Sequence, residues 1–173
     1  MRGLYPLAAG NRWTYHRLDG ESDPLTFALG APERMKLGCH GEHLAWPLEN
    51  PLDQGVAVVA LDDRVTIYRA TWVGARGMPD TTIDAEYRWE GDANWDFAHA
   101  GGGCVVTTVE VTRRGIERIT VPAGSFDCLR FDLNDGRYRD ETHWLCEGIG
   151  LVKRVERGLD SEGGLALIEA RLV

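Results

Sequence analysis

The sequence predicts a mostly β fold: a single strongly curved antiparallel sheet, forming a half-barrel or flattened barrel, with meander-like connections and little helix. Short runs rich in Val, Ile, Thr, Tyr and Trp recur along the chain, and turn residues end each of them, which is the pattern of an all-β domain. The 21 glycines supply much of that punctuation. No window of about a dozen residues carries the apolar stripe of an amphipathic helix.

The expected strands number roughly a dozen. The run 56–61 is apolar throughout, so we expect it to be buried on both faces. Residues 74–102 are the least regular part of the chain; they predict one strand and leave open a short helix that no motif signals. The expected strands are 12–18, 25–29, 35–39, 43–48, 56–61, 65–72, 83–89, 105–113, 116–121, 126–133, 137–146, 151–157 and 165–173.

Four short segments are expected to reverse the chain between strands. Asp62-Asp63 and Arg114-Gly115 each separate two strand-like runs, and Asp135-Gly136 is the strongest short hairpin signal in the sequence. Pro122-Ala123-Gly124 places a proline where a turn begins and a glycine where a positive φ is needed. We therefore predict a positive φ at Gly124.

Composition and charge narrow the class of protein. Hydrophobic residues make up 43% of the chain and charged residues 27%, and no low-complexity linker divides it, so residues 1–173 are predicted to form a single β domain. The formal net charge of −8 disfavours a nucleic-acid partner and an anionic membrane surface, because both are held by clustered Lys and Arg. The longest apolar run is too short for a membrane span.

The cellular compartment decides how the four cysteines are expected to behave. No apolar stretch follows Arg2, so the sequence as written predicts a cytoplasmic protein whose cysteines are reduced. If the N-terminus were truncated and the protein exported, the cysteines could form two disulfides instead. The cysteines are Cys39, Cys104, Cys128 and Cys146.

Three segments together resemble a family of uncharacterised bacterial proteins, many of them exported or lipid-anchored. They are Tyr5-Pro6-Leu7 with Gly10-Asn11-Arg12-Trp13-Thr14-Tyr15, then Ile119-Thr120-Val121-Pro122-Ala123-Gly124-Ser125-Phe126, then Glu141-Thr142-His143-Trp144 with Gly148-Ile149-Gly150-Leu151-Val152-Lys153-Arg154. The family is similar, more loosely, to the curved-sheet lipoprotein carriers LolA and LolB. This chain departs from the pattern in having four residues before the first segment and in lacking the helices that plug the carriers. Turn and core chemistry accounts for the motif residues themselves.

One group of residues has the chemistry of a metal site. Cys39, His40 and His43 surround Gly41, and a tight turn there could bring a thiolate and an imidazole onto one zinc ion. A polar hairpin tip explains the same residues, and no second ligand pair stands at a recognised spacing. We therefore expect no metal and no other cofactor, with a small zinc-dependent hydrolase as the least favoured function.

No catalytic residue is predicted, and whether the chain is an enzyme is left open, with a binding role favoured. None of the three serines lies in a nucleophile elbow. Glu141 and His143 share one face of an expected strand and could exchange a proton. A solvated outer face, with Trp144 pointing inward, is the interpretation that alternation favours.

The leading functional hypothesis is a non-enzymatic domain that binds a small apolar or amphipathic ligand inside the curved sheet. Trp13, Tyr15 and Trp144 are the candidate ligand-binding residues, because each is a large aromatic on a strand and belongs to a motif segment. The alternative is a structural or interaction module that pairs through an open sheet edge with another chain or with its own copy, as a homo-oligomer.

Overall fold

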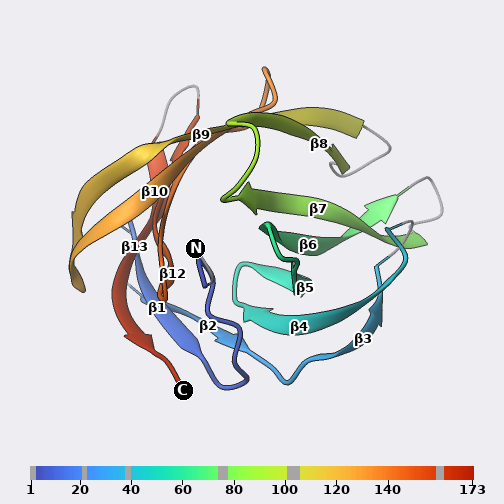
Figure 1. Ribbon diagram of the computed structural model, residues 1–173. Helices are drawn as coiled ribbons and strands as arrows, with labels where there is room; N and C mark the ends of the chain where they lie inside the picture. The colour runs from blue at the N-terminus through green and yellow to red at the C-terminus, as the bar shows by residue number, and fades with distance from the viewer. Residues whose placement is uncertain (1–2, 21–22, 38–39, 74–77, 101–105, 159–161) are drawn as a thin grey trace.

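The computed structural model describes residues 3–20, 23–37, 40–73, 78–100, 106–158 and 162–173, and Figure 1 shows them as one sheet curled into a nearly closed barrel. Every strand pair is antiparallel, and the described residues contain no α-helix. The fold class predicted from the sequence is confirmed. The strands are β1 Arg12–Arg17, β2 Leu25–Leu29, β3 Glu33–Lys36, β4 Glu42–Asn50, β5 Asp53–Ala60, β6 Arg64–Val73, β7 Met78–Arg88, β8 Asn94–Ala100, β9 Val106–Val121, β10 Gly124–Asn134, β11 Asp140–Cys146, β12 Gly150–Arg157 and β13 Glu162–Arg171.

The barrel consists of two meanders joined through the first strands of the chain. The order around the sheet is β7-β6-β5-β4-β2-β1-β13-β12-β11-β10-β9-β8, and β3 pairs with β4 outside that path. The pairing of β1 with β13 brings the two ends of the chain together. No helix among the described residues is long and apolar enough to cross a membrane.

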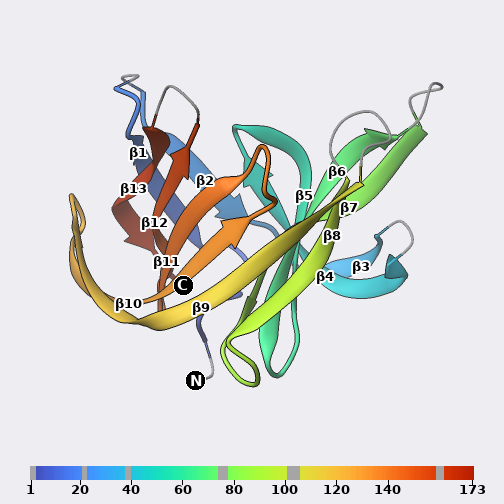
Figure 2. The same cartoon turned by 90° about the horizontal axis from the view of Figure 1, so that it is seen from above.

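The N-terminal segment before β1, in dark blue, lies within the ring of strands in Figure 1, and Figure 2 shows it at one end of the barrel. Leu4 is 1% exposed, and the Gly148 amide donates to the Gly3 carbonyl at 2.6 Å. The Trp13 indole, fully buried, packs on Tyr5 with ring centroids 5.4 Å apart. Its Nε1–H donates to the Ile149 carbonyl at 2.6 Å. The first and third motif segments therefore meet in space and hold this end closed.

Residues 56–59 of the apolar run are buried on both faces, as the sequence predicts, whereas Ala60 and Leu61 at its end are exposed. Val56 and Val58 face the main core, while Ala57 and Val59 belong to a second, smaller apolar cluster that includes Leu37. The strand β3 pairs with β4 beside this second cluster. The strand β5 is thus buried on both faces at the place where β3 covers the outer face of the barrel.

Two expectations about individual strands are wrong or incomplete. The strand expected at 83–89 begins earlier, as β7, and β8 at Asn94–Ala100 occupies a segment where no strand was predicted.

The reversal expected at Arg114-Gly115 does not occur, because β9 runs through both residues. They lie opposite the single residue Arg130 where the register with β10 shifts. A β-bulge absorbs the extra residue and bends the strand in place of a turn.

The Asp135-Gly136 signal gives a hairpin with a five-residue loop, 135–139, between β10 and β11. The Asp135 carboxylate organises this loop. Its Oδ1 accepts the backbone N–H groups of Arg137, Tyr138 and Arg139 at 2.7–2.9 Å. Partial burial would raise the pKa of Asp135, but these three donors hold it below its usual range.

The barrel has one seam, between β7 and β8, the two ends of the strand order. No ladder of main-chain hydrogen bonds joins the described residues of these two strands. Side chains from β8 and β9 instead form hydrogen bonds with carbonyl oxygens of β7. The His99 Nδ1 lies 2.8 Å from the Ile83 carbonyl oxygen, and Arg113 on β9 donates to the Arg88 carbonyl at 3.2 Å. The seam is therefore closed by side-chain hydrogen bonds.

Gly124 has a φ of +135°, so the positive φ predicted from Pro122-Ala123-Gly124 is confirmed. A side chain disfavours that conformation. We expect Gly124→Ala to lower the free energy of unfolding by about 1 kcal/mol or more in urea denaturation. Gly115→Ala is the matched control, because Gly115 has no positive φ and open space around its Cα. Equal denaturation midpoints for the two variants would contradict this account of the turn.

Candidate ligand-binding site

A cavity of about 650 Å³ opens at the end of the barrel formed by the β4–β5 turn and the β10–β11 loop. Its volume lies within the range of small-molecule sites. Four arginines and four carboxylates belong to its wall, so their formal charges balance, in a chain whose net charge is −8. These residues are Arg69, Arg137, Arg139, Arg154, Asp84, Asp135, Glu141 and Glu156.

A second hollow, of about 730 Å³, lies between the N-terminal segment and the turns at Leu61 and Trp89. Its described lining residues include the carboxylates Asp62 and Glu90 and no basic side chain. The first cavity is the better candidate site, because polar groups from many elements converge on it.

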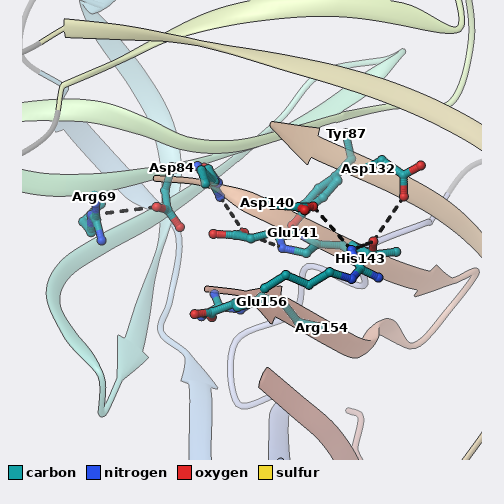
Figure 3. Close-up of polar contacts among 12 residues, drawn as sticks. Arg69, Asp84, Tyr87, Asp132, Asp140, Glu141, His143, Arg154 and Glu156 are labelled. Atoms are coloured by element: carbon teal, nitrogen blue, oxygen red, sulfur yellow. Dashed lines mark hydrogen bonds and ion pairs between the residues drawn. The ribbon is translucent and has the colours of Figure 1, made fainter. Parts of the chain in front are cut away.

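Three hydrogen-bonded side chains, those of Glu141, His143 and Tyr87, run from the cavity wall into the core of the barrel (Figure 3). The Glu141 Oε2 is 2.7 Å from the His143 Nε2, and the His143 Nδ1 is 2.7 Å from the Tyr87 hydroxyl. His143 is 2% exposed. A neutral imidazole satisfies this geometry if Nε2–H donates to the carboxylate and Nδ1 accepts from the tyrosine hydroxyl.

Arg139 extends this chain to the opposite wall. Its guanidinium donates to the Glu141 Oε2 at 3.0 Å and to the Asp84 carbonyl oxygen of β7 at 2.6 Å. The side chain of Arg139 is 10% exposed. A buried cation with a carboxylate and a carbonyl as partners is held firmly in place, because loss of either partner would leave a desolvated charge unpaired.

Register places Arg154 beside this group. On the β11–β12 ladder, His143 lies opposite Arg154 and Glu141 lies opposite Glu156. The Arg154 guanidinium forms an ion pair with Glu156 on its own strand. Gly164 of β13 has a φ of +141°, and a Cβ at that position would overlap the Arg154 carbonyl oxygen. The close approach of β13 thus depends on a glycine and fixes the backbone that carries Arg154.

A third arginine, Arg69 of β6, lies on the wall near the seam. Its Nε is 3.8 Å from the Asp84 Oδ1, and its Nη2 is 3.3 Å from the His99 Nε2. His99 is itself fixed by the Ile83 carbonyl. The cation is therefore held by two side chains that are part of the barrel's closure.

The buried environment shifts the titration of this network. Burial raises the pKa of Tyr87 well above its usual range. Burial also lowers the pKa of His143, against the opposing effect of the Glu141 carboxylate. Burial would raise the pKa of Glu141, but His143 and Arg139 outweigh it and hold that pKa far below the ordinary value. The network is thus an ionised carboxylate and an arginine with neutral histidine and tyrosine.

The cavity wall also contains apolar side chains. Phe27, Leu52 and Tyr138 contribute apolar surface to the lining. Leu52 is 45% exposed and Tyr138 is 83% exposed, which places two of the large exposed hydrophobic residues at this opening. A lining that combines these exposed apolar side chains with ionic ones is suited to a molecule that has both kinds of surface.

The three aromatic residues predicted to bind a ligand lie in different places. Trp13 and Tyr15 share the inner face of β1, and the Tyr15 hydroxyl donates to the Leu151 carbonyl at 2.8 Å. The Tyr15 ring packs edge-on against Phe27, 5.2 Å between centroids, directly behind the cavity lining. Trp144 is 8% exposed and donates to the Glu117 Oε2 at 2.8 Å. None of the three is among the lining residues, and their role in binding stays a prediction.

The two faces of β11 are the reverse of the expected ones. Glu141 and His143 point into the barrel, and Trp144 points outward between the cations of Arg130 and Lys153, which lie 5.9 and 5.4 Å from its ring centroid. Alternation gave the correct grouping of residues but the wrong face. The reason is that buried hydrogen bonds satisfy the polar pair inside, while cation–π contacts and a hydrogen bond cover the tryptophan outside.

The residues of the predicted metal site are only partly described. Cys39 lies outside the described residues. The rings of His40 and His43 lie 5.2 and 6.4 Å from the Tyr68 ring, and the His43 Nε2 is 2.8 Å from the His40 carbonyl oxygen. Over the part of the chain that the structure describes, no three His, Cys, Asp or Glu side chains are grouped as metal ligands would be.

Sequence reasoning identified Glu141 and His143 but missed Asp84, Arg139 and Arg154. A usable signal exists in the paired strands: Glu141 and His143 alternate on β11, and Arg154 and Glu156 alternate on β12. With the hairpin register, these four residues form one charged patch on a single face. The strand β7 brings Asp84 to the site only because the sheet curves into a barrel, and no sequence pattern near Asp84 indicates this.

Comparison with known proteins identifies the fold. No protein-family model matches the sequence, and no curated protein matches it. Among solved structures, a "putative exported protein with YmcC-like fold" from Bacteroides fragilis is 12% identical, with a TM-score of 0.52 over 98% of this chain and 99% of that one. A "putative lipoprotein" from Parabacteroides distasonis is 11% identical, with a TM-score of 0.50 over 98% of each chain.

At such identities the likeness shows a shared fold alone. It agrees with the resemblance to uncharacterised bacterial proteins that the sequence predicts. The three motif segments and the looser similarity to LolA and LolB stay predictions.

The titration of the buried network predicts how stability depends on pH. The pKa of His143 is lowered in the folded protein, so the unfolded chain binds the proton more readily and stability is lost as the pH falls below 6.5. The lowered pKa of Glu141 adds a second loss below pH 4.5. We expect the difference in unfolding free energy between the wild type and His143→Gln to narrow from pH 7.5 to pH 5, as measured by urea denaturation. A constant difference would show that His143 does not change its protonation in this range.

Proposed function

We propose that this chain binds a small amphipathic ligand in the cavity at the open end of the barrel. The observation that carries the proposal is that exposed apolar side chains, those of Leu52 and Tyr138, share one lining with four arginines and four carboxylates. Both chemistries line one opening of about 650 Å³. The apolar part of a ligand would cover the exposed apolar side chains, and its polar part would reach the charged ones.

The chemistry of the wall favours an amphipathic ligand over a purely apolar one. An apolar molecule filling the cavity would strip water from charged groups such as Asp84 and Arg154 without replacing its hydrogen bonds, and each such loss is costly. A ligand with a polar group can replace them. Tyr15 would then act indirectly, by supporting Phe27 from behind, while Trp13 would act by keeping the other end of the barrel closed.

We infer further that the domain works outside the cytoplasm. Two proteins with this fold bear the descriptions of a lipoprotein and an exported protein, and the motif segments resemble a family with many exported members. An extracytoplasmic domain that holds an amphipathic molecule would shield its apolar part from water. This inference extends those descriptions to the present chain.

The alternative functions have less support. For edge pairing, two carbonyl oxygens of β7, those of Ile83 and Arg88, already accept hydrogen bonds from side chains of neighbouring strands. A pairing partner would have to displace them. For a zinc hydrolase, the described His40 and His43 pack around Tyr68, which is an ordinary structural environment. A binding domain accounts for the apolar and ionic side chains that line the cavity, which the two alternatives leave unexplained.

A titration with fluorescent amphiphiles tests the proposal. Three single-chain probes carrying the same environment-sensitive dye and ending in a carboxylate, a hydroxyl or a trimethylammonium group should include at least one that binds saturably. We expect Leu52→Ser to weaken that binding by about fivefold to tenfold, because roughly 1 kcal/mol of apolar contact is lost.

Leu44→Ser provides the matched control. Leu44 is 56% exposed on β4 and does not line the cavity, so this variant should bind as the wild type does. If all three probes fail to bind, or if both variants weaken binding equally, this cavity is not the ligand site.

A further inference from the structure

We propose that the cavity selects a ligand with a carboxylate head group, which Arg154 binds in place of the Glu156 carboxylate. The inference deepens the proposed function and rests on it. It assigns the ligand's chemical class from the way in which the cations of the cavity are held. Arg137 lies exposed on the β10–β11 loop, so the decisive question is which of the other three arginines of the wall can exchange its present partner for a ligand.

Arg139 and Arg69 are not free to exchange. Arg139 is 10% exposed and bridges the Glu141 carboxylate and the Asp84 carbonyl oxygen. The Glu141 carboxylate is in turn fixed by His143. Arg69 is held by Asp84 and by His99 at the seam. Removing any of these partners would break contacts that keep the barrel closed.

Arg154 differs from both. Within the described part of the chain its one ion-pair partner is Glu156, two residues along the same strand. The Glu156 side chain is 43% exposed and that of Arg154 is 25% exposed, and an ion pair with so much solvent contact contributes little to stability. Glu156 can therefore turn into water at low cost. Guanidinium donors are then available to another planar carboxylate, which they bind bidentately.

Charge balance points to the same head group. With Glu156 in place, the formal charges of the cavity wall cancel. Once Glu156 turns away, the wall carries one formal positive charge in excess, and Arg154 keeps only the longer-range attraction of the Glu141 carboxylate. A ligand carboxylate restores the balance, a hydroxyl does not, and an ammonium group adds repulsion. The Glu156 carboxylate is thus the protein's own substitute for the ligand's head group.

Calorimetric titration with decanoate, decanol and decyltrimethylammonium tests the inference. We expect decanoate to bind at least about tenfold more tightly than the other two. Arg154→Gln should remove that preference, so that decanoate and decanol bind with similar affinity. Glu156→Gln should raise the affinity for decanoate by about threefold or more, because it removes the competing carboxylate.

Two comparisons make the outcome decisive. Arg118→Gln removes one positive charge from an exposed outer ion pair, at 68% exposure, and should leave the preference for decanoate intact. If Arg154→Gln does not fold, the half-exposed Glu156→Gln still decides the matter. Equal affinities for the three probes, or no gain with Glu156→Gln, would overturn the selection of a carboxylate while leaving a binding cavity. Failure of all three probes to bind would overturn the proposed function itself.

A different observation concerns Cys128 and Cys146. On the β10–β11 ladder Leu129 lies opposite Leu145, which places these two cysteines directly opposite each other on neighbouring antiparallel strands. Each of the two thiols lies near enough to the other to influence its pKa. Cβ atoms of directly opposed residues are close to the separation that a disulfide needs.

We infer that an oxidising environment joins these two cysteines in a cross-strand disulfide. The Cys146 thiolate attacks glutathione disulfide and releases one glutathione thiolate, giving a mixed disulfide. The Cys128 thiolate then attacks the Cys146 sulfur and releases the second glutathione. The two protein thiols lose two protons and two electrons, and glutathione disulfide is reduced to two thiols. Cys146 reacts first because Cys128 is fully buried.

Burial also sets the rate. It raises the pKa of Cys128 to about 12 and raises the pKa of Cys146 as well, so few thiolates form at neutral pH. The bond should therefore form during oxidative refolding and slowly in the folded protein.

The test is refolding in a buffer of reduced and oxidised glutathione, followed by alkylation and peptide mapping. We expect one peptide that joins Cys128 to Cys146 and is lighter by two hydrogens. In Cys128→Ser this peptide should be absent, with Cys146 glutathionylated or alkylated instead. Full alkylation of both cysteines in the refolded wild type would overturn the inference.

Discussion

A barrel of twelve strands encloses more space than the side chains of its own wall can fill, since about eight strands already give an interior just wide enough to be filled. The organisation of this molecule follows from that surplus. At one end the N-terminal segment enters the barrel and is held by the packing of Tyr5 on Trp13 and by the Gly148 amide, which donates to the Gly3 carbonyl. In the middle, aromatic rings such as Tyr87 and Phe131 pack against one another, 5.2 Å between centroids. At the other end the space remains open as the cavity.

The ionic network marks the boundary between the packed and the open parts of the barrel. Its deepest members, Tyr87 and His143, are nearly inaccessible, while Glu156 is almost half exposed. His143, Glu141 and Arg139 each have two fixed partners, whereas the outermost groups, Arg154 and Glu156, are paired with each other. The network is therefore rigid where it meets the core and adjustable where it meets solvent, which is the combination that a selective binding site requires.

Much of the fold could be predicted from the sequence because its signals are local. Alternation marks β1 and β10, and turn chemistry marks Gly124. The bulge at Arg114-Gly115 was misread because only the partner strand decides between a bulge and a reversal. The site was less predictable for a similar reason. Arg139 and Asp84 meet across the barrel, 55 residues apart in sequence, and the inward face of β11 is polar where alternation alone assigns an apolar one.

The seam between β7 and β8 gives the barrel one preferred line of mechanical weakness. Between any other neighbours in the circuit, separation would break a ladder of main-chain hydrogen bonds; at the seam it would break a few side-chain bonds, such as that of His99 to Ile83. Local opening has its lowest free energy where such ladders are missing. Arg69 and Asp84, two residues of the cavity wall, lie beside this line. The barrel can therefore change its circumference without unfolding a strand, and the width of the cavity would change with it.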